Sequence, residues 1–152
     1  MGTSANIGIK MPDGKIKAIY CGCNGYIEQV GLTLAEKYNS VKKINELMNL
    51  GNIHVLGDKI GSKHSLHKKK INDNSTSAYH RDGGYSWNDN SPDIHNSQED
   101  YIYSANDQGA EYTYLWQNGE WLVYKYNYHS DTKSFESLSY LLSKKIIDQI
   151  SR

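Results

Sequence analysis

The sequence has few of the residues that build a large apolar core or a covalent framework. Its 152 residues include two cysteines, two prolines and one phenylalanine, and hydrophobic residues make up only 38%. Cys21 and Cys23 are too few for a disulfide framework, and their one-residue separation would strain a bridge between them. Reduced thiols in a cytoplasm fit this cysteine usage best.

Net charge and long apolar runs are also missing. The 17 basic residues balance 17 acidic ones, so no field of one sign draws the chain toward nucleic acid or an anionic membrane. No run of 18 apolar residues predicts a membrane span, and residues 1–10 lack the pattern of a signal peptide. We therefore predict a cytoplasmic domain over residues 1–152, with no membrane contact and no sequence-specific nucleic-acid binding.

Tyrosine, by contrast, is abundant, with 13 residues against the single phenylalanine. A buried tyrosine ring still needs a hydrogen-bond partner for its hydroxyl. The bias therefore suits a shallow, wet core or a broad recognition surface. An AT-rich genome, which also favours Asn, Lys and Ile, is an equally good explanation.

Two pairs of strands are predicted, each around a strong turn. Residues 5–10 and 15–21 flank Met11-Pro12-Asp13-Gly14, where proline presets φ and glycine relieves the end of the turn. Residues 110–116 and 120–126 flank an Asn-Gly turn, which is the best short signal for a hairpin. Both pairs therefore predict antiparallel β-hairpins, and shorter strands are expected at residues 53–56 and 78–81.

Four segments place apolar residues at helical spacing. Ser40, Ser97 and Ser134 stand where an N-cap would satisfy the first backbone N–H groups of three of them. The expected helices are residues 28–38, 41–48, 98–108 and 135–150. Because hairpins imply antiparallel pairing, the predicted class is α+β, an antiparallel or mixed sheet with helices on one face.

Two polar segments lack a clear pattern. Residues 57–77 include three consecutive lysines, and residues 82–96 include Gly83-Gly84 and many Asn and Asp residues. Both are expected to be long loops. Lys63, together with residues 68–70, makes the first loop locally basic, which suits either phosphate contact or simple solvation.

The densest group of functional side chains is Tyr79-His80-Arg81-Asp82. Histidine can carry a proton or bind an anion, arginine matches phosphate and carboxylate, and aspartate can orient either. The alternative is a structural Arg-Asp pair that ends a strand, with the histidine exposed. In a ligand pocket, four further residues would join the motif: Thr3, Asn24, Tyr26 and Trp87.

Metal and thiol sites have less support. Cys21-x-Cys23 and His64-x-x-His67 could supply four zinc ligands, but a usual knuckle has two residues between its cysteines. Nothing in the sequence positions a histidine against either thiol for nucleophilic catalysis. We therefore expect two partly buried thiols and two solvated histidines, and no cofactor or metal.

The second hairpin carries aromatic residues on alternate positions. Tyr112, Tyr114 and Trp116 share one face, whereas Thr113 and Leu115 share the other. Packing in the core is the favoured interpretation of the aromatic face. Stacking on a nucleobase or a protein partner is the alternative, and an open edge of this hairpin could pair two copies of the chain.

Five short segments are informative together: Met1-Gly2-Thr3-Ser4, Asn24-Gly25-Tyr26-Ile27-Glu28, Val30-Gly31, Tyr79-His80-Arg81-Asp82 and Gly109-Ala110-Glu111-Tyr112-Thr113-Tyr114-Leu115. They resemble a family of small, mostly uncharacterised phage and prophage proteins of Gram-positive bacteria. Family members have a Met-Gly-Thr-Arg-like start, an Asp-Gly-Tyr-Pro-Glu-like loop and a Tyr-His-Arg-Asp segment. Here Ser4, Asn24 and Ile27 replace the family's arginine, aspartate and proline. The resemblance implies a phage or prophage origin, and hence the cytoplasm of an infected bacterium, but no established chemistry.

Three functions follow as hypotheses. The leading one is a non-enzymatic phage accessory protein that inhibits a bacterial antiviral defence by sequestering a nucleotide-derived immune signal. In it, His80, Arg81 and lysines hold phosphates, while tyrosines or Trp87 stack a base. The first alternative is a protein–protein inhibitor of a defence effector, for example an anti-CRISPR acting on a Cas nuclease. The second is a small enzyme with His80 and Asp82 as its acid–base pair.

Overall fold

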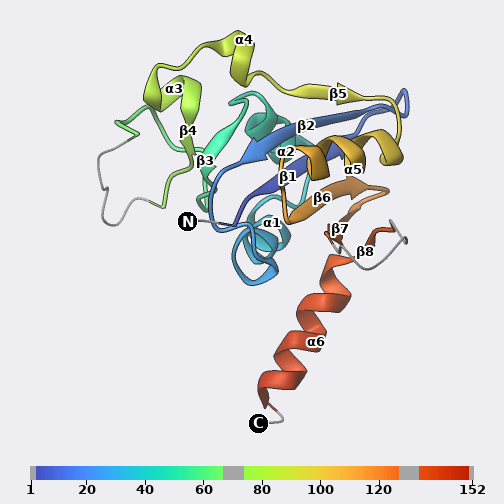
Figure 1. Ribbon diagram of the computed structural model, residues 1–152. Coiled ribbons are helices and arrows are strands. Elements are labelled where there is room, and N and C mark those ends of the chain that lie inside the picture. The colour runs from blue at the N-terminus through green and yellow to red at the C-terminus, as the bar shows by residue number, and fades with distance from the viewer. Residues whose placement is uncertain (1–2, 67–73, 127–133, 151–152) are drawn as a thin grey trace.

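Two hairpins form the centre of the molecule. The computed structural model describes residues 3–66, 74–126 and 134–150 (Figure 1). In it, β1 (Ala5–Lys10) pairs antiparallel with β2 (Ile16–Cys21), and β6 (Tyr112–Gln117) pairs antiparallel with β7 (Glu120–Lys125). Asn118 and Gly119 have φ values of 54° and 79°, as the tight turn of the second hairpin requires. Both predicted hairpins are confirmed.

The hairpins lie side by side in one mixed sheet. The remaining strands are β3 (Ile53–Val55), β4 (Ser77–Ala78), β5 (Asp93–His95) and β8 (Glu136–Ser137). The order is β4-β3-β2-β1-β6-β7-β8, and β5 pairs with β2 outside this path. β1 is parallel to β6 and β2 is parallel to β3, whereas the other pairs are antiparallel. The predicted α+β class with a mixed sheet is confirmed.

Helices cover both faces of this sheet. On one face lie a π-helical turn, η1 (Ile27–Gly31), and the helices α1 (Leu32–Lys37) and α2 (Val41–Met48), whose apolar residues join those of the strands in the larger core cluster. The helix α6 (Leu138–Ile150) joins this cluster through Leu138, Leu141 and Leu142 at its start, and it extends away from the sheet (Figure 1). On the other face lies α5 (Gln98–Asp107), which buries Tyr101 against Ile16 and Leu115. Only one helix-bearing face was expected. The second exists because Gly8 leaves room for the Tyr101 ring, whose nearest atoms would lie 2.9 Å from a Cβ at that position.

Residues 79–96 differ most from expectation. The strand expected at residues 78–81 ends at Ala78, and α3 (Tyr79–Gly83) follows at once. The Asp82 carboxylate accepts the N–H of Ala78 over 2.8 Å, which favours a helical turn. The segment expected as a loop, 82–96, contains α4 (Trp87–Asn90) and β5, because β2 has a free edge that β5 completes.

Helix ends follow the predicted caps in two cases. Ser40 accepts the Lys43 N–H over 3.3 Å and Ser97 accepts the Asp100 N–H over 3.1 Å. In the last helix the cap is Ser137, which accepts the Tyr140 N–H over 3.3 Å, rather than Ser134, because β8 occupies the residues in between. No helix among the described residues has the length and apolar character to cross a membrane.

Candidate functional site

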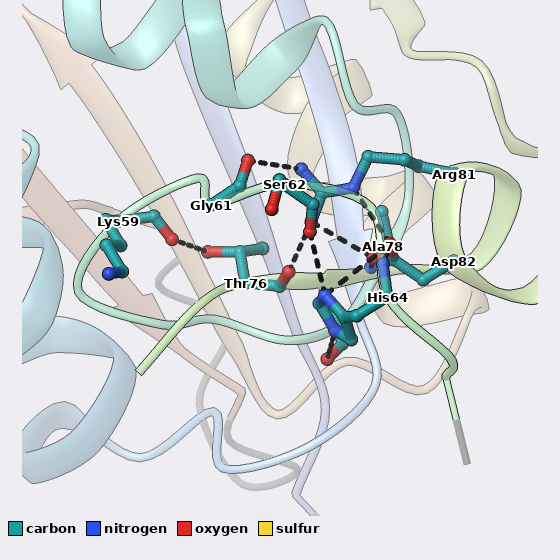
Figure 2. Close-up of polar contacts among 9 residues, drawn as sticks. Lys59, Gly61, Ser62, His64, Thr76, Ala78, Arg81 and Asp82 are labelled. Carbon is teal, nitrogen blue, oxygen red and sulfur yellow. Dashed lines mark hydrogen bonds and ion pairs between the residues drawn. The ribbon is translucent and has the colours of Figure 1, made fainter. Parts of the chain in front are cut away.

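Arg81 and Asp82 form an ion pair in α3, in which the Arg81 side chain is 18% exposed and the Asp82 side chain is buried (Figure 2). The Arg81 Nε donates to Asp82 Oδ1 over 3.0 Å, and its Nη2 donates to Oδ2 over 3.1 Å. The backbone N–H groups of His64 and Ala78 donate to the same carboxylate over 3.0 and 2.8 Å. The Asp82 side chain is fully shielded from solvent, and four hydrogen bonds replace the water it has lost.

These hydrogen bonds decide the ionisation of Asp82. Burial alone would raise the pKa of its carboxyl group, because a low-dielectric environment disfavours the charged form. The donors on Arg81, Ala78 and His64 outweigh burial and hold the pKa below its usual value. Asp82 is therefore a carboxylate at neutral pH, and it has no proton to donate to a substrate.

The other donors of Arg81 join separate segments. Its Nη1 donates to the Gly61 carbonyl over 3.0 Å and its Nη2 donates to the Thr76 carbonyl over 2.7 Å. The guanidinium thus connects the segment around Gly61, the segment leading into β4, and α3 (Figure 2). This is the structural Arg–Asp pair that the sequence offered as an alternative, and it leaves Arg81 few donors for a ligand.

His64 is engaged in the same network. Its Nδ1 donates to the Ser62 carbonyl over 3.0 Å and its Nε2 lies 2.9 Å from Ser77 Oγ, so the ring is not solvated as expected. His67 lies outside the described residues. Among the described residues no three His, Cys, Asp or Glu side chains are grouped to hold a metal ion.

His80 contacts the segment that follows α3. It is exposed, its Nδ1 donates to the Tyr85 carbonyl over 2.7 Å, and its ring lies edge-on to Trp87 with centroids 5.3 Å apart. His80 of the motif and Trp87 of α4 are therefore both exposed to solvent. The two side chains proposed as an acid–base pair have different partners, which removes the geometric basis of that hypothesis.

A hollow of about 510 Å³ opens beside α3. We call it the α3 hollow. Its basic side chains are the exposed Lys63, together with His80 and Arg81. None of its described lining residues is a tyrosine. The described residues that line it are Asn49, Leu50, Lys63, His80, Arg81 and Gly84.

Thr3, Asn24 and Tyr26 lie outside the α3 hollow. Thr3 is buried and its carbonyl accepts the Gly25 N–H over 2.8 Å. Asn24 has a φ of 61°, which lets the loop turn back toward η1. Tyr26 is 44% exposed and its ring lies edge-on to Tyr112. The eight predicted site residues thus fall into two groups, one around α3 and one at the N-terminal end of β1.

Sequence reasoning missed a cluster between the loop after β2 and the strand β3. Cys23 Sγ lies 3.8 Å from His54 Nδ1, and the Tyr79 hydroxyl lies 3.3 Å from the same nitrogen. Cys23 and His54 are 31 residues apart, so no local motif could reveal the pair. The parallel pairing of β2 with β3 brings them together.

Sequence reasoning also missed a second hollow, of about 290 Å³, on the α5 side of the sheet. It lies where the edge of β2 changes partner, because β5 pairs with residues 16–18 and β3 with Cys21. In between, the Tyr20 N–H donates to the Asn52 side chain over 2.9 Å. Its lining is Asn6, Ala18, Ile19, Tyr20, Asn52, Asp93, His95 and Gln108.

The aromatic face of the second hairpin is part of the core. Tyr114 is fully buried, and Tyr112 and Trp121 are 8% and 5% exposed. The Tyr114 hydroxyl donates to the Gly25 carbonyl over 2.7 Å, and the Trp121 Nε1 donates to the Tyr38 carbonyl over 2.9 Å. These rings are therefore unable to stack on a nucleobase.

No protein-family model, curated protein or solved structure matches the chain. The geometry of these sites is therefore the basis for proposing a function.

Proposed function

We propose that the protein binds an anionic, nucleotide-derived ligand in the α3 hollow and sequesters it without transforming it. Supplied by a phage to its bacterial host, such a protein would inhibit a defence that signals through that ligand. The observation that carries the proposal is the gathering of Lys63, His80 and Arg81 around one hollow of about 510 Å³. The phage context comes from the sequence resemblance alone.

The charges in the α3 hollow suit a phosphate. Asp82 neutralises much of the Arg81 charge, so Lys63 is the main source of positive charge. Lys63 has no ion pair within residues 3–66, 74–126 and 134–150. His80 adds a charge when it is protonated. Trp87 is not among the described residues that line the hollow, but it lies next to His80 and is 39% exposed, so a base that extends from the hollow would stack on its indole.

Sequestration fits the geometry better than catalysis at this motif. Each oxygen of the Asp82 carboxylate already accepts two hydrogen bonds, and the carboxylate is shielded from solvent. A general base must reach the proton it removes, and this carboxylate faces Arg81 and backbone N–H groups instead. The α3 hollow therefore offers charge and shape to a ligand but no acid–base pair.

The test is calorimetric titration of the purified protein with linear and cyclic nucleotides and ADP-ribose derivatives, followed by chromatography of the ligand. We expect one class to bind and to be recovered unchanged. Lys63→Glu should weaken binding by about tenfold or more, since one phosphate contact is lost and a repulsion added. The matched control is Lys15→Glu, an exposed lysine in the β1–β2 turn.

Two results would refute the proposal. One is that no phosphate-bearing compound binds or raises the melting temperature, because a ligand specific for the native state must stabilise it. The other is that Lys63→Glu and Lys15→Glu bind equally well. If the ligand were consumed instead of recovered unchanged, the protein would be an enzyme and not a sequestering protein.

A second candidate is a protein–protein inhibitor of a defence effector. Tyr85, Trp87 and Ile94 are 50%, 39% and 50% exposed, and all three lie between α3 and the end of β5. Exposed aromatic residues are common anchors of protein interfaces. If this function holds, Tyr85→Ala should abolish co-elution with an effector, whereas Tyr103→Ala, which changes a 70% exposed tyrosine on α5, should not.

A further inference from the structure

The loop after β2 carries a partly exposed thiol against a histidine. Cys23 Sγ lies 3.8 Å from Nδ1 of His54 on β3. The Gly22 N–H donates to the Ile53 carbonyl over 3.0 Å, which holds the loop against β3. A Cβ on Gly22 would lie 2.4 Å from the Tyr79 hydroxyl. Glycine therefore permits the close approach that puts thiol, imidazole and phenol together.

Tyr79 orients the imidazole. Its hydroxyl lies 3.3 Å from His54 Nδ1, and the two rings are in contact with centroids 5.6 Å apart. Burial raises the pKa of Tyr79 to about 12, so the phenol keeps its proton. Nδ1 is also the nitrogen nearest the thiol, 3.8 Å from Cys23 Sγ. It has one lone pair, so it accepts a hydrogen bond from the thiol or from the phenol, and once it has taken the thiol proton its N–H donates to the phenol oxygen.

Cys21 provides an internal contrast. It is fully buried, and its Sγ donates to the Cys23 carbonyl over 3.4 Å. Burial raises the pKa of this thiol to about 12, so it stays protonated and inert at neutral pH. The chain thus contains one shielded thiol and one accessible thiol beside a base, separated by a single residue.

We propose that Cys23 is a nucleophilic thiol, activated by His54 and positioned by Tyr79, that forms covalent adducts with small carbon electrophiles. The Sγ proton passes to His54 Nδ1. A sulfur electron pair forms the S–C bond while the leaving group departs with the electrons of its own bond to carbon. This activity is separate from the proposed sequestration, because none of the three residues lines the α3 hollow.

Four titratable groups among the described residues interact electrostatically with Tyr79: Tyr20, Tyr85 and the two cysteines. All four are neutral when protonated, so none of them places a fixed charge beside the thiol and the imidazole. An activated thiol reacts at a pH where an isolated thiol is still protonated.

The experiment measures alkylation of the full-length, reduced protein by iodoacetamide between about pH 5 and pH 9, with sites assigned by mass spectrometry. We expect a single adduct on Cys23, formed about tenfold faster at neutral pH than on a free cysteine. Cys21 should react only after denaturation. His54→Gln should remove the rate advantage, and Tyr79→Phe should shift the pH profile. His95→Gln, a histidine on β5, is the matched control.

Two outcomes would overturn the proposal. One is a Cys23 rate equal to that of a free cysteine. The other is a folded His54→Gln variant that reacts as fast as wild type. If His54→Gln fails to fold, the wild-type pH–rate profile decides the matter. An inflection of the alkylation rate near pH 6.5, about the ordinary pKa of a histidine, supports activation of the thiol. An inflection only near pH 8.5, about the ordinary pKa of a thiol, refutes it.

Discussion

Arg81 binds the carboxylate of its own sequence neighbour, Asp82, through two hydrogen bonds of 3.0 and 3.1 Å. Adjacent residues seldom face each other, because successive side chains of a helix or strand diverge. Here the pair forms where β4 passes directly into α3. The Asp82 carboxylate is buried, and the Arg81 guanidinium joins three segments of the chain, so the pair is central to the stability of this region.

Arg81→Ala should destabilise the protein by about 3 kcal/mol, because it leaves the buried Asp82 carboxylate without its charged partner. Urea unfolding followed by circular dichroism measures this change. Lys42→Ala, at an exposed position of α2, should change the unfolding free energy by less than about 0.5 kcal/mol. A similar small effect of Arg81→Ala would contradict the structural role of the pair.

Asp82 should also make the free energy of unfolding depend on pH in the acid range. Its folded pKa lies below the ordinary value of 3.8, so its contribution is complete above that value and is lost as pH falls through the folded pKa. Asp82→Asn should therefore lower the unfolding free energy at neutral pH, and this difference from wild type should shrink in acid. Urea titrations of both proteins from neutral pH downward measure it. A constant difference would show that Asp82 has the same pKa in the folded and unfolded chain.

Two tyrosines of α5 provide a matched comparison. Tyr101 is fully buried and its hydroxyl donates to the Tyr114 carbonyl over 2.7 Å, whereas Tyr103 is 70% exposed. Tyr101→Phe should lower the free energy of unfolding by about 1 kcal/mol, because a buried hydrogen bond is lost. Tyr103→Phe should have no measurable effect. Equal unfolding free energies for the two variants would mean that α5 does not pack against the sheet as described.

Gly22→Ala tests the close approach of the Cys23 loop to α3. The new methyl carbon would lie 2.4 Å from the Tyr79 hydroxyl, and we expect a loss of about 1–3 kcal/mol from overpacking. Tyr79→Phe removes the clashing oxygen. In a double-mutant cycle, the two substitutions together should therefore cost less than the sum of their separate effects. Strict additivity would indicate that the loop and Tyr79 are not in contact.

Local signals in the sequence were sufficient to predict the two hairpins and two of the helix caps. The Asn118-Gly119 turn needs two residues with positive φ, and few dipeptides other than Asn-Gly adopt it easily. Ser40 and Ser97 bond to backbone groups three residues away. Such interactions close within a few residues, so they leave a pattern that can be read from the chain.

The candidate site was predictable only in part. The sequence by itself identified Tyr79-His80-Arg81-Asp82 as a polar cluster and included a structural Arg-Asp pair among its interpretations. It could not show that the guanidinium of Arg81 donates hydrogen bonds to the carbonyl groups of Gly61 and Thr76. It also could not show that Thr3 and Tyr26 lie away from the α3 hollow, since both facts depend on how distant segments pack.

Tertiary structure alone decided the long-range features. β1 is parallel to β6, which follows about a hundred residues later, and residues 93–95 become a strand because β2 offers an unpaired edge. The same edge brings His54 to Cys23. In each case the deciding interaction is a backbone hydrogen bond between segments far apart in the chain. Backbone groups are the same in every residue but proline, so the sequence determined the local turns and caps, whereas the pairing that assembles the sites left no signature in it.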